Sequence, residues 1–204
     1  CLRSKLDLLS SNFADTIVSI ETDPLNLLRE MIIPSTPAEL TLDHFSHLEK
    51  YLTPLLPYFK TSLSIRRRGV NLFLYGAPGT GKTQLAKVLA REMNCELYEV
   101  SCEDSDGDAI DGNKRLRAFR AAQSFLAQRR AMILFDEVED VFNDGNLWSG
   151  RRSTAQKQKA WINRILEDNT VPTLWLSNTL SGLDPAFARR FDSVVCLPIP
   201  PKDQ

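Results

Sequence analysis

The chain has 204 residues, of which 43% are hydrophobic and 25% are charged. This size and balance suit one globular α/β domain with a sizeable core and some additional chain. The formal net charge of −1 offers no broad positive field, so we do not expect nucleic acid to be the main partner. No apolar run approaches the roughly 18 residues that span a membrane. The four cysteines lack a C-x-x-C pair, so we expect reduced thiols and a cytoplasmic protein.

The first 41 residues show no single periodic pattern. Prolines at positions 24, 34 and 37 interrupt the helical spacing there, so we expect a linker or the end of a preceding region. Apolar residues recur every three or four positions over 42–59, although Pro54 and Pro57 argue against one uninterrupted helix. We expect the main domain at 42–204. Because the chain begins with cysteine rather than methionine, we expect a piece of a longer protein.

Beyond residue 70, strand and helix patterns alternate. The strand candidates are apolar runs at 70–75, 96–101, 131–136, 171–177 and 193–197. Helical patterns lie between most of them, at 82–93, 113–130 and 154–168, with a shorter piece at 184–191. This alternation is typical of a parallel sheet covered by helices on both faces. In such sheets a ligand binds at the carboxyl ends of the strands.

A glycine-rich loop joins the first of these strands to its helix. Residues 76–83 match the phosphate-loop pattern G-x-x-x-x-G-K-[ST]. Glycines let the backbone approach phosphate oxygens, and successive N–H groups and the following helix then favour an anion. Lys82 can reach the terminal phosphates, and the Thr83 hydroxyl can bind Mg²⁺. A turn that binds nothing is the alternative, and the flanking strand and helix argue against it.

The third strand candidate ends in two carboxylates, Asp136 and Glu137. A buried strand that ends in this way is costly unless a cation lies nearby. The phosphate loop therefore favours Asp136 as a Mg²⁺ ligand and Glu137 as the residue that orients and deprotonates an attacking water. The alternative is that both acids only begin the next helix, at 138–142.

The fourth strand candidate leads into Ser177 and Asn178. An amide at this place could hold the attacking water near a terminal phosphate. Spacing alone favours the simpler alternative, an asparagine that forms a turn.

Three stretches together resemble the AAA clade of AAA+ ATPases: 76–83, 132–142 and 177–192, the last similar to the clade's second region of homology. The resemblance runs from about residue 42 to residue 200. It implies a P-loop NTPase fold, with a five-stranded parallel sheet in the order 5-1-4-3-2 sandwiched between helices. The C-terminal lid subdomain is expected to be absent from this chain.

The resemblance also implies ATP and Mg²⁺ as ligands and assigns roles to residues. The expected nucleotide-binding residues are Gly76, Ala77, Pro78, Gly79, Thr80, Gly81, Lys82, Thr83, Gln84 and Asp136. Thr83 and Asp136 would hold Mg²⁺, Asp136 through water. Catalysis would use Glu137, with Asn178 as sensor 1 and Arg189 and Arg190 as arginine fingers. The 42–45 region would line the adenine pocket, and Ser101 would restrain Glu137.

An arginine finger acts on a neighbouring subunit, so the resemblance implies a ring, usually a hexamer. A guanidinium neutralises developing phosphoryl charge well, which agrees with this role for Arg189 and Arg190. The alternative for both residues is a surface salt bridge.

Two departures from the family concern the substrate and the lid. Threading members carry an aromatic pore loop after the second strand, whereas residues 102–112 here are acidic and contain no aromatic residue. Such a loop lacks the apolar area that would grip a peptide. Trp148 is a nearby aromatic that could replace it, or it packs on its own domain. Without a lid, we expect weak nucleotide binding and slow turnover from this stretch alone.

The leading hypothesis is an ATPase that couples hydrolysis in a ring to the remodelling of a macromolecule, with protein as the expected substrate. An ATP-dependent switch or scaffold with little hydrolysis is the second hypothesis, and the acidic loop favours it. A nucleic-acid-remodelling AAA+ protein is the third, and the net charge argues against it. Small-molecule kinases share the phosphate loop but leave Asn178 and the paired arginines without a role.

Overall fold

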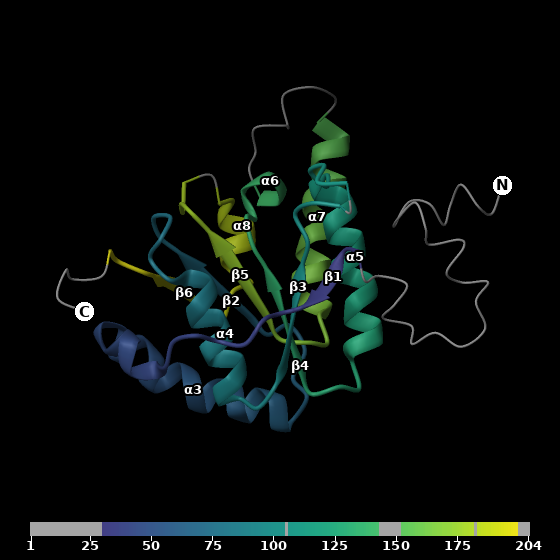
Figure 1. Ribbon diagram of the computed structural model, residues 1–204. Coiled ribbons are helices and arrows are strands. Elements are labelled where there is room, and N and C mark those ends of the chain that lie inside the picture. The colour runs from purple at the N-terminus through teal and green to yellow at the C-terminus, as the bar shows by residue number, and fades with distance from the viewer. Residues whose placement is uncertain (1–29, 105, 143–151, 182, 200–204) are drawn as a thin grey trace.

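A sheet covered by helices on both faces forms the body of the molecule (Figure 1). This computed structural model describes residues 30–104, 106–142, 152–181 and 183–199. Within these ranges the sheet has six strands in the order β1-β3-β4-β5-β2-β6. The family resemblance predicted a P-loop α/β fold, and the architecture confirms it.

The five strand candidates all form strands, each within a residue or two of its expected bounds. They are β2 (Asn71–Tyr75), β3 (Glu96–Val100), β4 (Ala131–Phe135), β5 (Thr173–Ser177) and β6 (Ser193–Cys196). All four pairings among them are parallel, and they follow the predicted order. β2 lies between β5 and β6, one strand in from the edge of the sheet, so the strand that leads into the glycine-rich loop is paired on both sides.

The connecting helices also fall where the periodicity indicates. They are α4 (Lys82–Glu92), α5 (Gly112–Leu126), α6 (Glu139–Phe142), α7 (Arg152–Asp168) and α8 (Pro185–Ala188). α5 stops four residues before its predicted end at Arg130. No helix in the described ranges is both long and apolar enough to cross a membrane.

A sixth strand, β1 (Ile32–Pro34), was not predicted, so the expected count of five strands was wrong. β1 pairs antiparallel with β3, with Ile32 opposite Val100. Three residues are too few to show a period of two, and a proline usually argues against a strand. Pro34 is tolerated because an edge strand leaves one row of backbone groups unpaired. Thus part of the segment expected to be a linker belongs to the sheet.

The prolines in the 42–59 segment do not interrupt a helix, contrary to the sequence argument. The segment divides earlier, into a 3-10 helix η2 (Leu42–Leu48) and α3 (Glu49–Ser64). α3 continues through Pro54 and Pro57, both of which are exposed. Water can therefore satisfy the carbonyl groups that the missing proline N–H groups leave free.

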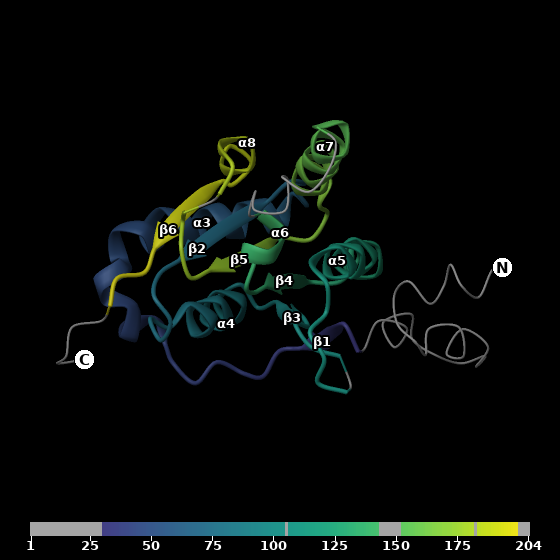
Figure 2. The same ribbon diagram turned by 90° about the horizontal axis from the view of Figure 1, so that it is seen from above.

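The core has two parts, one on each face of the sheet (Figure 2). One part packs the sheet against α5, α7 and α8, with Phe119, Trp175 and Phe135 in mutual ring contact. The other part packs the sheet against η2, α3 and α4. Strand side chains alternate between these faces, so each central strand is covered on both sides.

A buried polar network at the amino end of the sheet centres on Asn71, which has no exposed surface. Its Nδ2 donates to the Leu166 carbonyl at 2.7 Å. Its Oδ1 accepts from Trp175 Nε1 at 2.9 Å and from Asn169 Nδ2 at 3.1 Å. The network connects β2, β5 and the end of α7, which fixes these elements relative to one another.

Replacing Asn71 by alanine should therefore lower the free energy of unfolding by about 2–4 kcal/mol, because the Trp175 N–H and the Leu166 carbonyl lose their buried partner. Urea denaturation monitored by Trp fluorescence measures the change. Arg120→Ala, on the exposed face of α5, is the control and should change stability by about 0.5 kcal/mol or less. Equal stabilities of the two variants would contradict the role given to Asn71.

Candidate functional site

Most of the predicted site residues gather at the carboxyl edge of three adjacent strands, whereas Arg189 and Arg190 precede the amino end of β6 (Ser193–Cys196). β5 pairs with β2 on one side and with β4 on the other. The glycine-rich loop follows β2, Asp136 follows β4 and Asn178 follows β5. Three segments that are far apart in the sequence therefore meet at one place, as the rule for parallel sheets predicts.

The loop 76–81 has a backbone that needs glycine at specific positions. A Cβ on Gly76 would lie 2.3 Å from the Leu197 carbonyl oxygen, so the loop passes against the end of β6 at a distance that only glycine allows. Gly79 and Gly81 have φ angles of +80° and +85°, the left-handed region that glycine adopts without strain. Thr80 closes the turn by donating its hydroxyl to the Ala77 carbonyl at 2.9 Å. Open space surrounds Gly79, where a Cβ would meet no atom within 4 Å.

Lys82 begins α4 and points back under this loop. Its buried ammonium donates to the carbonyls of Gly76 and Ala77, at 2.7 and 3.1 Å. A third bond, of 3.1 Å, reaches Asn178 Oδ1 at the end of β5. All three acceptors are neutral oxygens, and within the described ranges no carboxylate pairs with Lys82. The positive charge is therefore available to an anion in the loop.

Thr83 and Asp136 form the second link between segments. The Thr83 hydroxyl donates to Asp136 Oδ2 at 3.3 Å. Hydroxyl and carboxylate oxygens are the ligands that Mg²⁺ prefers, and Mg²⁺ commonly uses one or two carboxylates together with substrate phosphates. The described part of the chain holds no group of three or more His, Cys, Asp or Glu side chains that could bind a metal. These residues fit a magnesium ion shared with a phosphate rather than one held by protein alone.

Glu137 has an unusual backbone, with a φ of +51° that side chains rarely adopt. Its N–H donates to Asp136 Oδ1 at 2.8 Å, and its side chain is exposed at the edge of the site. This conformation separates the two acids: Asp136 turns toward Thr83, and Glu137 remains open to solvent. The alternative that both acids only begin a helix fails for these two residues, because α6 begins at Glu139.

Glu139 supports Asn178, and the sequence argument missed it. Its Oε1 accepts from the Asn178 N–H and, at 3.0 Å, from the Ser177 hydroxyl. The backbone of Asn178 is thus held by α6 while its amide oxygen is held by Lys82. The sequence offered only a weak signal, an acid two positions after Glu137 that fits neither the strand nor an apolar helix face.

Arg115 is a second functional candidate that the sequence argument missed. It lies on α5, is only 2% exposed and stacks over the Phe135 ring at 4.5 Å. Its guanidinium donates to the backbone carbonyls of Asp136 and Glu137. The available signal was its place in the apolar stripe of α5, one turn before Phe119, where a charged side chain is unusual.

The two arginines at 189 and 190 differ in their surroundings. Arg190 Nε makes an ion pair with Glu167 at 2.9 Å, and its NH1 donates to the Ala186 carbonyl at 2.5 Å. Arg189 is exposed and makes no such bond to any described residue. Asp184 is the N-cap residue of α8, which precedes both, and its pKa is lowered mainly by its hydrogen bond from Lys159. Arg190 is thus bonded within its own subunit, whereas Arg189 is exposed to solvent.

Three further expectations concern residues around the loop. Phe45 packs against Gly81, 3.4 Å from where a Cβ would lie, so η2 lies beside the phosphate loop. Gln84 accepts from the Glu39 N–H at 3.0 Å, which ties the segment after β1 to α4. Ser101 donates its hydroxyl to the Glu103 carbonyl, and none of its described bonds reaches Glu137.

The acidic loop forms a small closed turn in which Asp104 Oδ1 accepts from the N–H groups of Asp106 and Asp108, at 3.1 and 3.0 Å. Most of its carboxylates are exposed. Trp148, the proposed aromatic replacement, lies outside the described residues.

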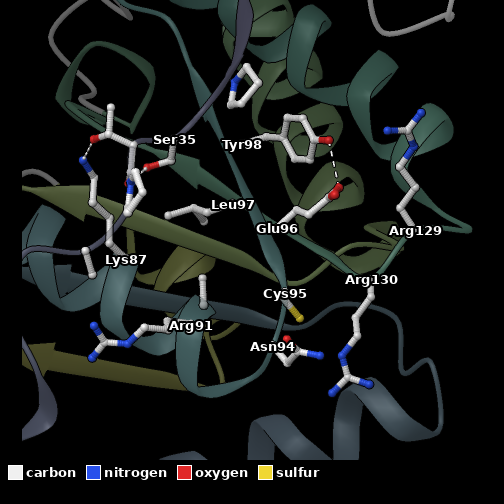
Figure 3. A pocket seen from close by; sticks show the side chains of 15 residues that line it. Ser35, Lys87, Arg91, Asn94, Cys95, Glu96, Leu97, Tyr98, Arg129 and Arg130 are labelled. Carbon is white, nitrogen blue, oxygen red and sulfur yellow. Dashed lines mark hydrogen bonds between the residues drawn. The ribbon is translucent and has the colours of Figure 1, made fainter.

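A large cavity of about 980 Å³ lies away from this site (Figure 3). It borders the amino end of β3 and the end of α4, and no predicted site residue lines it. Burial raises the pKa of the Cys95 thiol there, so the sulfur is a protonated, poor nucleophile. Two of its arginines are already engaged: Arg130 donates to the Met93 carbonyl, and Arg91 lies 3.6 Å from Glu92. Although this cavity is large, we do not assign it as the functional site, because no predicted site residue lines it.

Comparison with known proteins identifies the family. The model of the ATPase family associated with various cellular activities (AAA) matches residues 72–199. This is well over half of the chain and includes the loop, both acids, Asn178 and both arginines. The chain therefore belongs to the AAA family, as the resemblance predicted.

Individual relatives from the same comparison are about 30% identical to this chain. ATPase family gene 2 protein homolog B from Bos taurus is 32% identical over 140 residues, which are 65% of this chain and 18% of that protein. Spastin from Sus scrofa is 30% identical over 154 residues, 73% of this chain and 24% of that protein. The chain thus spans a quarter or less of these two relatives.

Among solved structures, the FIGL-1 AAA domain in complex with ADP superposes with a TM-score of 0.58 and 19% identity. The superposition covers 91% of this chain and 65% of that one. At this identity the likeness shows a shared fold.

Alanine substitutions at two glycines of the loop test steric clash and backbone strain separately. Gly76→Ala should destabilise the protein by roughly 3 kcal/mol or more, because its Cβ would overlap the Leu197 carbonyl and force β6 or the loop to move. Gly79→Ala meets open space and should cost only about 1–2 kcal/mol of strain. Urea denaturation of both variants measures the difference. A Gly79→Ala variant that is the less stable of the two would contradict the close approach at Gly76.

Proposed function

We propose that this chain is the ATP-binding and ATP-hydrolysing module of an AAA protein that remodels a macromolecule, with protein as the substrate class. The observation that carries the proposal is the meeting of Lys82, Asp136 and Asn178 beneath one glycine-rich loop, joined by two hydrogen bonds between segments. Membership in the AAA family supports it. A small-molecule kinase would need the phosphate loop but would leave Asn178 and the paired arginines without a role.

Binding would be the task of the loop and the two residues after it. The loop would supply the N–H groups of residues 77, 79 and 81, because Pro78 has none and those of Gly76 and Thr80 donate to the Ser177 and Ala77 carbonyls. Lys82 supplies a positive charge whose hydrogen-bond acceptors are neutral. Thr83 and Asp136 would hold Mg²⁺, which on binding supplies charge neutralisation between the phosphates. The 42–45 region would line the adenine pocket, because Phe45 packs beside Gly81, although the Phe45 ring is itself buried. Gln84 would continue the site along α4.

Hydrolysis would depend on Glu137 and Asn178. The exposed Glu137 carboxylate is placed to take a proton from a water, which is general-base catalysis. Asn178 is held at two points, by Glu139 at its N–H and by Lys82 at its side-chain oxygen. Its amide nitrogen would then face the same water in a fixed orientation. Positioning of this kind lowers the entropic part of the barrier.

The outward-facing Arg189 supports assembly into a ring, with a hexamer as the expected form. An arginine that completes a neighbour's site makes turnover depend on assembly. Arg190 was predicted for the same role, but its ion pair with Glu167 favours a structural role within its own subunit. A cytoplasmic location also stays a prediction.

A second candidate function is an ATP-dependent switch or scaffold that hydrolyses little. The acidic, aromatic-free loop at 102–112 favours it, because the loop offers little apolar area to a threaded peptide. Nucleotide-dependent assembly with near-zero turnover in the native protein would identify this function.

The Glu137→Gln variant tests the hydrolysis proposal. It should retain ATP binding, because the loop and Lys82 are unchanged, and lose about 10²–10⁴-fold in turnover because the amide cannot accept the proton. Phosphate release and ATP titration by calorimetry measure the two quantities in the native protein. Glu92→Gln, an exposed acid at the end of α4, is the matched control and should match the wild type. Unchanged turnover in Glu137→Gln would remove Glu137 from the role.

Single and mixed variants test the arginine assignment. Arg189→Ala should lower turnover by about 10³–10⁵-fold, as loss of an arginine finger does, with little change in stability. Arg190→Ala should mainly lower the melting temperature, because it loses Glu167 and the Ala186 carbonyl. Mixing Arg189→Ala with Glu137→Gln should restore part of the activity, since some interfaces then pair an intact acid with an intact arginine. Intact rings without recovery would exclude action between subunits.

A further inference from the structure

We propose that Arg115 is a positioning residue for Glu137, which holds the backbone of the two acids in the conformation that presents the Glu137 carboxylate. This inference rests on the proposed function, because it concerns the residue that would activate water. Arg115 touches neither acid's carboxylate in these contacts; it acts on the peptide groups that carry them.

The contacts of the Arg115 guanidinium converge on the ends of two neighbouring strands. NH1 donates to the Glu137 carbonyl at 3.2 Å, and NH2 donates to the Asp136 carbonyl. Nε donates to the Ser101 carbonyl, just beyond the end of β3, at 3.2 Å. The Phe135 ring lies beneath the guanidinium, 4.5 Å away. One planar group therefore joins the last residues of β3 to the turn that follows β4.

This turn needs external support because its backbone is strained. Glu137 has a φ of +51°, and a non-glycine residue persists in that region only where surrounding contacts hold it. Asp136 provides one contact, to the Glu137 N–H. The Val138 N–H provides a second, to the Leu176 carbonyl at 3.1 Å. Arg115 provides two more, on the carbonyls before and after the Glu137 N–Cα bond. Without them, the peptide can relax toward an ordinary φ and turn the Glu137 side chain away.

The place of Arg115 on α5 gives it a second connection. Its own N–H donates to the Asp111 carbonyl, where the acidic loop ends and α5 begins. Asp111 also caps the helix through bonds to the N–H groups of Asn113 and Lys114. A shift of the loop would therefore move Arg115 and, through it, the backbone of Glu137. Arg117, two residues later, is exposed and makes none of these contacts.

A double-mutant cycle in the native protein tests the proposal. Arg115→Met keeps the length of the side chain and removes its donors, and should lower kcat for ATP by about 100-fold, the loss typical of a displaced catalytic group. Nucleotide Kd should change less than about twofold, because the phosphate loop is untouched. Arg115→Lys keeps the charge but not the planar, forked donor geometry, and should lower kcat by about tenfold. In a Glu137→Gln background, neither change should lower the residual single-turnover rate further.

Two controls separate positioning from loss of fold. Arg117→Met makes the same chemical change on the exposed face of α5 and should leave kcat unchanged. Leu126→Ala removes a fully buried side chain at the far end of α5, so it lowers the melting temperature without touching the site. If Arg115→Met does not fold, Arg115→Lys carries the test through the same cycle.

The outcomes are distinct. A kcat within twofold of the wild type for the folded Arg115 variants overturns the inference and leaves the proposed function standing. The inference is also overturned if Leu126→Ala, at the same melting temperature, lowers kcat as much as the Arg115 variants do. It is overturned as well if the Arg115 changes lower the rate equally in the wild type and in the Glu137→Gln background. If the wild type does not hydrolyse ATP, or if Glu137→Gln hydrolyses it normally, the proposed function fails and this inference fails with it.

Discussion

The hydrogen bonds of Lys82 are the constraint on which the site depends. A buried ammonium is costly to desolvate, and here three neutral oxygens from two segments surround it. Those bonds hold the start of the glycine-rich loop against the end of β5, so the loop and Asn178 cannot move independently. Because the acceptors are neutral, no hydrogen-bonded carboxylate of the described residues neutralises the Lys82 ammonium. A polyanion is the natural ligand for such a charge at the start of a helix.

Around Lys82, several contacts hold the backbone of the site residues in place. Gly76 approaches the Leu197 carbonyl closely, Glu137 adopts a positive φ, and Arg115 and Glu139 bind peptide groups of the site. The carboxylate of Glu137 itself stays exposed. Such an arrangement suits a group that must act on an exchangeable ligand, because precision comes from the supporting residues and access is kept open.

The two arginines after α8 show how neighbouring residues of one type can diverge. Arg190 faces Glu167 on α7, within its own subunit, and Arg189 faces outward. Both residues follow α8 in a turn in which the Arg190 N–H donates to the Phe187 carbonyl, and of the two only Arg190 pairs with α7. The acidic loop and the absence of an aromatic residue from it leave the nature of the substrate open to the experiments on turnover and assembly.

The sequence by itself determined the local elements and the residues of the phosphate loop, because both are encoded by short-range patterns. Strands β2 to β6 are short, mostly apolar segments, and Gly76 to Thr83 match a pattern whose chemistry requires those residue types. The order of the strands and the proposed sensor 1 role of Asn178 came from the family resemblance, since spacing alone left that residue as a turn former.

Only the tertiary structure decided the rest, and the reasons are physical. β1 is too short to show a period, and it is a strand only because β3 has a free edge. α3 tolerates two prolines because both face water, which the chain order does not reveal. Arg115 and Glu139 act through backbone groups 22 and 39 residues away, and no local pattern encodes contacts at that separation. The different surroundings of Arg189 and Arg190 likewise depend on where α7 lies.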